Sequence, residues 1–226
     1  FIIDICKKYN TDGLIILNTN HPTNIVMDYY NNDGSWETLC GNGMICTSLF
    51  INNDSNKYNM KCGDAYHQVT YINSLTNVSM PKPKYKSKKI RIESTEGYYI
   101  DSGAKHFVIN QEDPWCSDTK IIELARKIRY NTNLFPKGIN VNFYKIINKN
   151  TIEVRTYEKG VEALMLSCAS GSFACAYHFC RIGNVDCEIN IINPGGNYIC
   201  SFKNDFKNNF IQSKGVIEYK DFIILQ

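Results

Sequence analysis

The sequence has no long hydrophobic run and little net charge. No window of its 226 residues approaches the run of about 20 apolar residues that a transmembrane helix needs. The first residues lack the cationic and then apolar pattern of a secretory signal peptide. A formal net charge of +3 does not indicate a nucleic-acid partner. We therefore expect a soluble, cytoplasmic protein whose partners include neither a membrane nor a nucleic acid.

Positive charge gathers in only one segment, near the middle of the chain. Its members are Lys82, Lys84, Lys86, Lys88, Lys89 and Arg91, interleaved with Pro81 and Pro83. One basic run without stacking motifs is weak support for nucleic-acid binding. We interpret this basic segment as a solvated connector or an edge strand, whose lysines discourage pairing with another sheet. It also marks the predicted boundary between two domains.

The ten cysteines show no metal-ligand pattern. Their even number could also indicate a disulfide framework, but a chain of this length with 43% hydrophobic residues can bury a core without covalent links. Among the late cysteines only Cys175 and Cys180 approach a ligand spacing, and residues five apart on a helix point to different faces. We expect free thiols, a reducing compartment and no metal.

Most of the chain is predicted to form short strands. Runs rich in β-branched and aromatic residues are separated by Asn, Gly, Asp and Pro turns, and they cover residues 14–17, 24–30, 68–72, 98–100, 106–109, 141–147, 151–157, 188–192 and 221–225. Two apolar runs, 44–51 and 173–180, predict buried helices. Because such helices need walls all round, we favour an α+β fold with sheets curled around each helix. An open α+β sheet with two core helices is the alternative.

A cysteine, a turn of small residues and an apolar run follow one another twice. Cys40-Gly41-Asn42-Gly43 precedes the first predicted helix, and Cys168-Ala169-Ser170-Gly171 precedes the second. A thiol at a helix start faces unpaired backbone N–H groups and the positive end of the helix dipole, which favours the thiolate. Two such cysteines in similar halves suggest a pair of acid/base groups that face one substrate carbon.

Seven ordered motifs span nearly the whole chain and resemble the successive signatures of the diaminopimelate epimerase family. They are Tyr30-Asn31-Asn32-Asp33-Gly34-Ser35, Cys40-Gly41-Asn42-Gly43, Asp101-Ser102-Gly103-Ala104-Lys105-His106-Phe107-Val108, Phe135-Pro136 with Asn140-Val141, Arg155-Thr156-Tyr157-Glu158-Lys159-Gly160, Cys168-Ala169-Ser170-Gly171 and Pro194-Gly195-Gly196. A single Cys-Gly-Asn-Gly motif would be weak support, whereas seven in the family's order are strong support.

The resemblance implies a cofactor-independent epimerase that converts LL-diaminopimelate to the meso form, for lysine and cell-wall precursor synthesis. The expected fold has two pseudo-symmetric domains, each a mixed β-sheet curled barrel-like around a central helix, with the active site in the cleft between them. Cys40 and Cys168 would be the two acid/base thiols. The substrate α-carboxylate would bind backbone N–H groups at the two helix starts, which are those of Gly41, Asn42, Ala169 and Ser170.

The resemblance also implies roles for polar residues outside the helix starts. Those expected at the distal end of the substrate are Asn31, Asn140, Glu158 and Lys159, and those expected to tune the pKa of the thiols are His106 and Glu158. Each of three residues has a simpler reading: His106 as a satisfied core histidine, Glu158 as a surface residue and Asn31 as a turn former. The resemblance implies a small-molecule amino-acid substrate, and a homodimer is left open.

Departures from the family pattern bear on the substrate. Ala104-Lys105-His106 stands where the family usually has Asn-Pro-His, and Glu158-Lys159-Gly160 stands where it has Glu-Arg-Gly, which replaces a planar fork by a point charge. The usual Gly-Glu-Thr motif is blurred, with Glu162-Ala163-Leu164 in its place, and the opening of the chain lacks part of the family's first motif. A racemase for another amino acid, such as proline, and a non-catalytic binding relative or a thiol-independent isomerase of the same fold are therefore alternatives.

Domain boundaries follow from the basic segment. We expect residues 1–97 to form an N-terminal domain with Cys40 and residues 98–218 a C-terminal domain with Cys168. A last strand at about 219–226 would return to the first domain. The first residues, up to Asp4, resemble the end of the family's opening motif, and Ile5 begins a later one. Either the protein is shortened here or the sequence omits a loop of the family's cleft between them, and we favour the omission.

Overall fold

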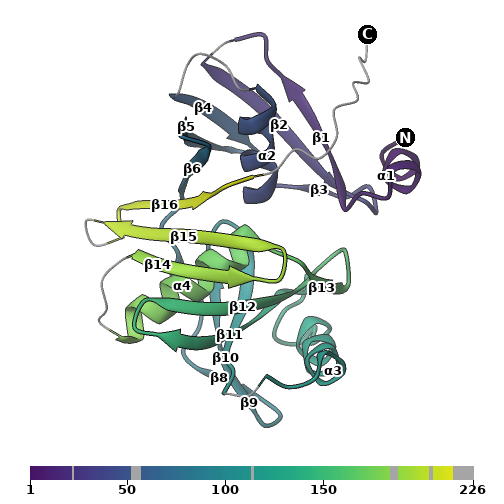
Figure 1. Ribbon diagram of the computed structural model, residues 1–226. Coiled ribbons are helices and arrows are strands. Elements are labelled where there is room, and N and C mark those ends of the chain that lie inside the picture. Colours follow the sequence, from purple (N-terminus) through teal and green to yellow (C-terminus); the bar gives the residue numbers. More distant parts are fainter. Residues whose placement is uncertain (22, 52–56, 113–114, 184–187, 204–205, 216–226) are drawn as a thin grey trace.

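A computed structural model describes residues 1–21, 23–51, 57–112, 115–183, 188–203 and 206–215. These residues form an α+β fold with one large mixed sheet and four helices (Figure 1). The helices are α1 (Ile2–Tyr9), α2 (Gly41–Ile51), α3 (Asp118–Arg129) and α4 (Ala169–Gly183).

Sixteen strands are found in the described residues. In chain order they are β1 (Gly13–Asn18), β2 (Asn24–Asn31), β3 (Trp36–Glu37), β4 (Lys57–Cys62), β5 (Ala65–Ile72), β6 (Leu75–Met80), β7 (Lys84–Tyr85), β8 (Ile90–Ile92), β9 (Thr95–Asp101), β10 (Lys105–Asn110), β11 (Asn140–Asn148), β12 (Thr151–Glu158), β13 (Ala163–Met165), β14 (Glu188–Asn193), β15 (Gly196–Lys203) and β16 (Asn208–Ser213). Along the sheet their order is β1-β2-β4-β5-β6-β16-β15-β14-β12-β11-β10-β9-β7, with β3, β13 and β8 paired to β2, β12 and β9.

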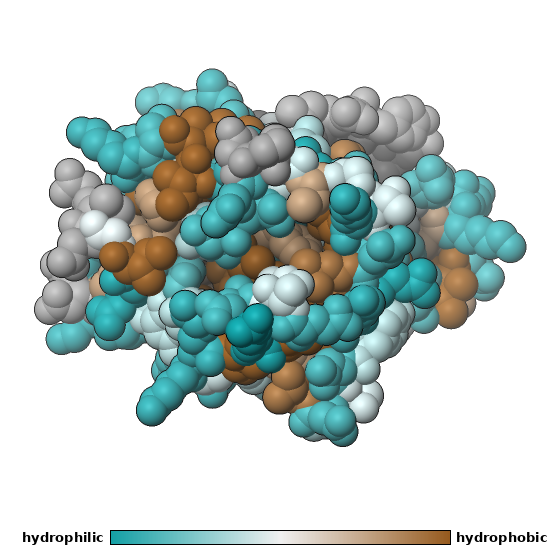
Figure 2. Space-filling model, turned by 90° about the horizontal axis from the view of Figure 1, so that it is seen from below, coloured by the Kyte–Doolittle hydropathy of each residue, from teal (hydrophilic) through white to brown (hydrophobic). Residues whose placement is uncertain are grey.

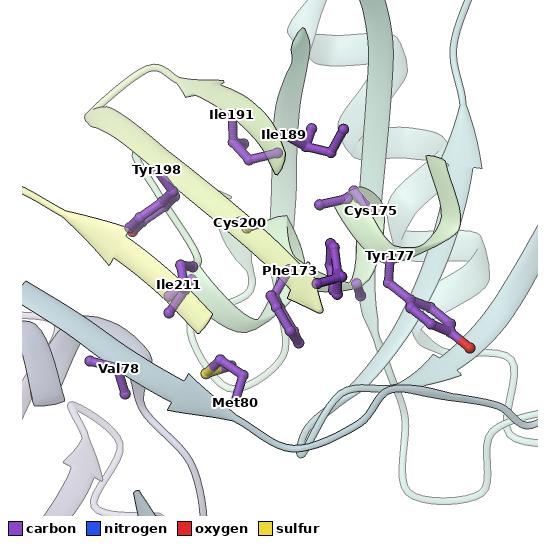
Figure 3. Close-up of a cluster of buried hydrophobic side chains, with 14 of the residues drawn as sticks. Val78, Met80, Phe173, Cys175, Tyr177, Ile189, Ile191, Tyr198, Cys200 and Ile211 are labelled. Atoms are coloured by element: carbon purple, nitrogen blue, oxygen red, sulfur yellow. The ribbon is translucent and has the colours of Figure 1, made fainter. Parts of the chain in front are cut away.

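The late strand β16 joins the two halves of this sheet. It pairs antiparallel with β15 on one side and with β6 on the other, where Ile211 lies opposite Val78. Figure 1 shows this yellow strand between the dark strands of the first half and the green strands of the second. Figure 3 shows Val78 and Met80 near Ile211 and Phe173, and all four belong to one hydrophobic cluster. The core is therefore continuous across the β6–β16 pair.

Helix α4 is the more deeply enclosed of the two helices that the sequence predicts. It packs against β10, β11, β12, β14 and β15, and every residue from 169 to 180 is buried. Helix α2 packs against β2, β5 and β6. Its Phe50 is 53% exposed and its Cys46 is exposed as well, so α2 has a solvent-exposed side that its apolar composition does not predict.

Strands β10, β11 and β12 carry a helix on each face. Side chains alternate between the two faces of a strand, so Tyr144 packs in the α4 cluster while Phe143 packs with Ile121 and Ile128 of α3. The Ser117 side chain accepts a hydrogen bond from the Lys120 N–H and caps α3. Because both faces of these three strands are packed against helices, the residues at the strand ends are held in place by the fold.

The basic segment lies at the end of the sheet. β7 is the last strand in the sheet order and pairs with β9, as an edge strand should. The hydroxyl of Tyr85 and His178 Nδ1 form a hydrogen bond of 2.8 Å, which fastens this strand to α4. Figure 2 shows a face of the molecule on which hydrophilic side chains surround separate hydrophobic groups.

Most predicted elements are confirmed in kind. The strands expected between residues 14 and 192 and the two buried helices are present. Helices α1 and α3 and strands β3, β4, β6, β8, β13, β15 and β16 were not predicted, and the strand expected at 221–225 lies outside the described residues. The cysteines in the described ranges form no disulfide bonds with one another, and no helix there is long and apolar enough to cross a membrane. The division at residue 97 stays a prediction.

Candidate active site

A cavity of about 600 Å³ lies where helices α2 and α4 begin. It collects the residues that the sequence analysis singles out from both halves of the chain. Those that line it are Asn31, Cys40, Gly41, Asn42, Asn140, Glu158, Lys159, Cys168, Ala169 and Ser170. His106 is the exception, because it is fully buried behind the cavity wall.

Both cysteines occupy the same position relative to their helices. The Cys40 carbonyl accepts a 3.0 Å hydrogen bond from the Met44 N–H, and the Cys168 carbonyl accepts one of 2.9 Å from the Ser172 N–H. Each cysteine is thus the residue just before its helix, where the first N–H groups have no partner within the helix. At Cys40, the Gly43 N–H donates to the sulfur over 3.2 Å.

The two helix starts lie against each other at the wall of the cavity. A Cβ on Gly41 would lie 2.6 Å from the Ala169 Cβ, so glycine is required for this approach. The Asn42 side chain ties the halves together: its Nδ2 donates to the Ser167 carbonyl over 3.3 Å, and its Oδ1 accepts from the Tyr198 hydroxyl over 2.5 Å. Two sets of helix-start N–H groups therefore meet in one cavity, which suits an anion.

Burial favours the protonated form of both thiols. It raises the pKa of Cys40 well above its ordinary value and the pKa of Cys168 to about 12, and the charge of Glu158 adds to the rise at both sulfurs. Hydrogen bonds to Gly43, and at Cys168 to Ser170 and Gly171, lower these pKa values. The helix starts thus favour thiolate as the sequence suggests, but burial outweighs them.

A line of hydrogen bonds runs from Asn142 through His106 and Ser170 to Cys168. Asn142 Nδ2 donates to His106 Nδ1 over 3.0 Å, so the proton of the neutral ring is on Nε2, which lies 3.1 Å from the Ser170 hydroxyl. That hydroxyl lies 3.6 Å from the Cys168 sulfur. Burial lowers the pKa of His106 to about 4, so the ring is neutral. His106 can therefore act on the thiol through Ser170, without a charge of its own.

Asn142 is a residue of this line that the sequence analysis missed. It is fully buried, and its Oδ1 accepts a 2.9 Å hydrogen bond from the Thr156 hydroxyl, which fixes the orientation of the amide. A Cβ on Gly171 would clash with the same oxygen. The signal was present in the sequence: a lone Asn stands within the apolar run of β11, where a buried polar side chain needs partners.

The carboxyl group of Glu158 has a pKa near neutral pH. Burial, with Glu37 and Asp12 as the next causes, raises its pKa to about 7. Its side chain makes no hydrogen bond or ion pair within the described part of the chain. Asp12 and Glu37 also line the cavity, and the sequence analysis did not single them out. The three acidic residues come from β12, β3 and the end of the α1–β1 connection, so their grouping depends on the fold.

Two asparagines present opposite polarity to the cavity. Asn31 Nδ2 donates to Ser35 Oγ over 3.0 Å and to Glu37 Oε1 over 3.1 Å, which uses both of its hydrogens and leaves Oδ1, an acceptor. Asn140 Oδ1 accepts a 2.8 Å hydrogen bond from the Lys159 N–H, which leaves the amide as a donor. The cavity can thus bind both a donor and an acceptor group.

The turn after Glu158 is held by an ion pair. Glu162 Oε1 accepts from the Gly160 N–H over 3.1 Å and forms a 2.7 Å salt bridge with Arg129 of α3. Gly160 and Glu162 both have a left-handed backbone, with φ of 94° and 60°. These contacts set the direction in which Glu158 and Lys159 enter the cavity. The sequence analysis treated Glu162 only as part of a blurred motif.

Comparison with known proteins places the chain in a family. The family model for diaminopimelate epimerase matches residues 98–219. The diaminopimelate epimerase of Aquifex aeolicus is 31% identical, over 93% of this chain and 80% of that protein, and the one of Archaeoglobus fulgidus is 32% identical, over 87% and 76%. The chain belongs to the diaminopimelate epimerase family.

Solved structures share the fold at low identity. A probable proline racemase from Agrobacterium radiobacter K84 matches with a TM-score of 0.72 at 11% identity, over 95% of this chain and 76% of that one. A putative PhzC/PhzF phenazine biosynthesis protein from Clostridium difficile matches with a TM-score of 0.69 at 12% identity, over 99% and 87%. At such identities they show the fold alone, one used by epimerases and racemases.

Two departures from the diaminopimelate epimerase pattern lie inside the cavity. Ala104 and Lys159 both line it, together with Lys105 and Lys137. A lysine offers charge without the planar fork of an arginine, and Ala104 offers no polar group. Within the described ranges, no three His, Cys, Asp or Glu side chains group as they would around a metal ion.

Proposed function

We propose that this protein inverts the α-carbon of LL-diaminopimelate to give the meso form, with Cys40 and Cys168 as its two catalytic residues. One observation carries the proposal: the two cysteines precede two helices whose starts lie against each other at the wall of one cavity. Inversion needs a base on one face of a carbon and an acid on the other. Two thiols from opposite helix starts supply that pair.

The cavity contains groups that can stabilise the carbanion formed in this reaction. An α-hydrogen is weakly acidic, and its removal leaves a carbanion that fixed dipoles must stabilise. In our proposal the N–H groups of Gly41, Asn42, Ala169 and Ser170 bind the α-carboxylate and take up this charge. One cysteine enters as thiolate and takes the proton, and the other gives its proton to the opposite face. No organic cofactor or metal has a step in this scheme.

The neighbours of each thiol tune this exchange. The Ser170 hydroxyl can donate to a Cys168 thiolate, with its orientation held by His106 Nε2–H. Glu158 raises the pKa of both thiols while it is ionised, and its own pKa of about 7 lets its charge follow the protonation of the site. We propose His106 and Glu158 as residues that set the pKa of the thiols.

The distal end of the cavity suits a second amino-acid centre. Asn31 presents an acceptor and Glu158 an acidic group, which fit an ammonium, whereas Asn140 presents a donor and Lys159 a positive charge, which fit a carboxylate. Diaminopimelate carries both groups on its distal carbon. This match supports diaminopimelate over an amino acid with an apolar side chain.

The two-domain arrangement belongs to the same proposal. Residues 1–97 and 98–218 would be pseudo-symmetric domains whose sheets curl around α2 and α4, with the cavity between them. The packing of α4 against five strands and of α2 against three supports it. The strand β16 of the second domain then joins the two through its pairing with β6.

A racemase for another amino acid is the second candidate. Ala104 and Lys159 favour it, because a distal carboxylate has fewer directed hydrogen bonds here. The deciding measurement is the uptake of deuterium at the α-carbon from D2O, over a panel with LL- and meso-diaminopimelate, proline, alanine and lysine. Exchange with diaminopimelate alone supports the proposal, exchange with another member supports the second candidate, and no exchange with any member overturns both.

A further inference from the structure

The acidic side of the cavity contains one residue that the two-thiol mechanism does not use. Glu37 lies on the short strand β3, where it pairs with Tyr29 of β2, and it lines the cavity three residues before Cys40. One carboxylate oxygen, Oε1, accepts from Asn31 Nδ2 over 3.1 Å. Its second oxygen has no hydrogen bond or ion pair within the part of the chain that the structure describes.

Glu37 fixes which way the Asn31 amide points. An ionised carboxylate only accepts hydrogen bonds, so the amide must turn its NH2 group toward Glu37 and its oxygen away. The other hydrogen of that group is used by Ser35 Oγ at 3.0 Å. Glu37, at the edge of the site, thus makes the almost fully buried Asn31 a hydrogen-bond acceptor for a ligand that binds beside it.

Negative charge gathers on this side of the cavity. Glu37 and Asp12 both act on Glu158 to raise its pKa, and no lysine or arginine acts on Glu158 to lower it. The charge of Lys159 acts on Asp33. Three carboxyl groups and the Asn31 amide therefore line this side of the cavity together with Tyr29, whose hydroxyl is a neutral donor close to Glu158 and Asp12.

We propose that Glu37 is a specificity-determining residue, which makes this side of the cavity a receptor for an ammonium group on the substrate side chain. The inference rests on the proposed function and deepens it by naming Glu37 as a residue that selects for the second amine of the substrate. Glu37 acts in two ways, through its own charge and through the orientation of Asn31. An ammonium group satisfies Glu37, Glu158 and Asn31 Oδ1 together, which an alkyl chain cannot do.

Two ligands and two variants separate these effects. Diaminopimelate and 2-aminopimelate have the same chain and differ only in the distal amine. Glu37→Gln removes the charge and keeps an oxygen for the Asn31 amide, whereas Glu37→Ala removes both. Glu123→Gln is the matched control, because Glu123 is an exposed carboxylate on α3 outside the cavity. Binding is measured by calorimetry on the complete protein, and α-deuterium exchange is measured in parallel.

The wild-type protein should bind diaminopimelate at least tenfold more tightly than 2-aminopimelate, in line with one hydrogen-bonded charge pair. Glu37→Gln should reduce that ratio about tenfold by weakening diaminopimelate alone, Glu37→Ala should reduce it at least as much, and Glu123→Gln should leave it unchanged. No wild-type preference for the amine, or an equal loss for both ligands, overturns the inference. A retained preference without α-deuterium exchange would overturn the proposed function instead.

Discussion

Gly41 and Ala169 lie against each other at the starts of the two central helices, so closely that a methyl group on Gly41 would reach within 2.6 Å of the Ala169 Cβ. Each residue follows one of the two predicted catalytic cysteines. The spacing of these two backbones therefore sets the spacing of Cys40 and Cys168. This contact therefore links the packing of the two helix starts to the distance between the thiols that the proposed reaction needs.

Gly41→Ala should separate the helix starts and lower activity strongly. Overpacking at a tight contact costs about 1–3 kcal/mol of stability, and a displacement of about 1 Å at a reacting pair can cost about 100-fold in rate. The double variant Gly41→Ala with Ala169→Gly restores the space and should recover most of kcat/KM. If the single variant keeps full α-hydrogen exchange, the contact does not control the thiols.

Replacement of either cysteine should stop inversion. Cys40→Ala and Cys168→Ala each remove one of the two proton carriers, so both should lose epimerisation to background while the protein stays folded. Cys46→Ala is the control, since this thiol also lines the cavity but lies within α2 rather than at its start. Chiral chromatography of the product measures the effect. Inversion that survives in either variant would contradict the two-thiol mechanism.

Local features of the fold were predictable from the sequence because they depend on local chemistry. Alternating and β-branched runs predict strands such as β10 and β11, and apolar runs predict α2 and α4. The pairing of β16 with β6 was not predictable, because it joins residues more than 120 positions apart through side chains typical of any strand. Helix α3 was also missed, although its Ser117 cap precedes an amphipathic pattern.

The same difference between local patterns and long-range contacts applies to the site. The cysteine motifs were found because a thiol before a helix is a local pattern. The acidic group of Asp12, Glu37 and Glu158 depends on three separate elements that meet only in the folded protein. The line from Asn142 to Ser170 likewise needs the parallel pairing of β10 with β11, which sets Asn142 beside His106.

Ser170→Ala should shift the pH dependence of the reaction upward. The Ser170 side chain lowers the pKa of Cys168, because a hydrogen bond to sulfur favours the thiolate. Without it the thiolate forms at higher pH, so the acidic limb of the kcat/KM profile should move toward alkaline pH. Ser201→Ala on β15 is the control. A profile identical to that of the wild type would show that the hydroxyl does not act on Cys168.

Glu158 should make the protein less stable as the pH rises. Its pKa is about 7 in the folded protein, against an ordinary value of 4.5, so the folded state holds the proton more tightly. Stability from this group is complete below about pH 4.5 and is lost as the pH rises through 7. Glu158→Gln should therefore raise the free energy of unfolding at pH 8 by about 1–2 kcal/mol, while kcat falls. Urea titrations at pH 5 and pH 8 check this, and a gain of equal size at both would contradict the assignment.

The two departures from the family pattern should limit the selectivity for diaminopimelate. Lys159 supplies charge without a planar fork, and Ala104 supplies no hydrogen bond, although both line the cavity. The double variant Ala104→Asn with Lys159→Arg should raise kcat/KM for diaminopimelate by roughly tenfold, the size of about one hydrogen bond to a charged group. Lys149→Arg is the control, because Lys149 is exposed in the β11–β12 turn. If the double variant leaves diaminopimelate turnover unchanged while another amino acid is clearly preferred, the substrate is that amino acid and the cavity serves a related racemase.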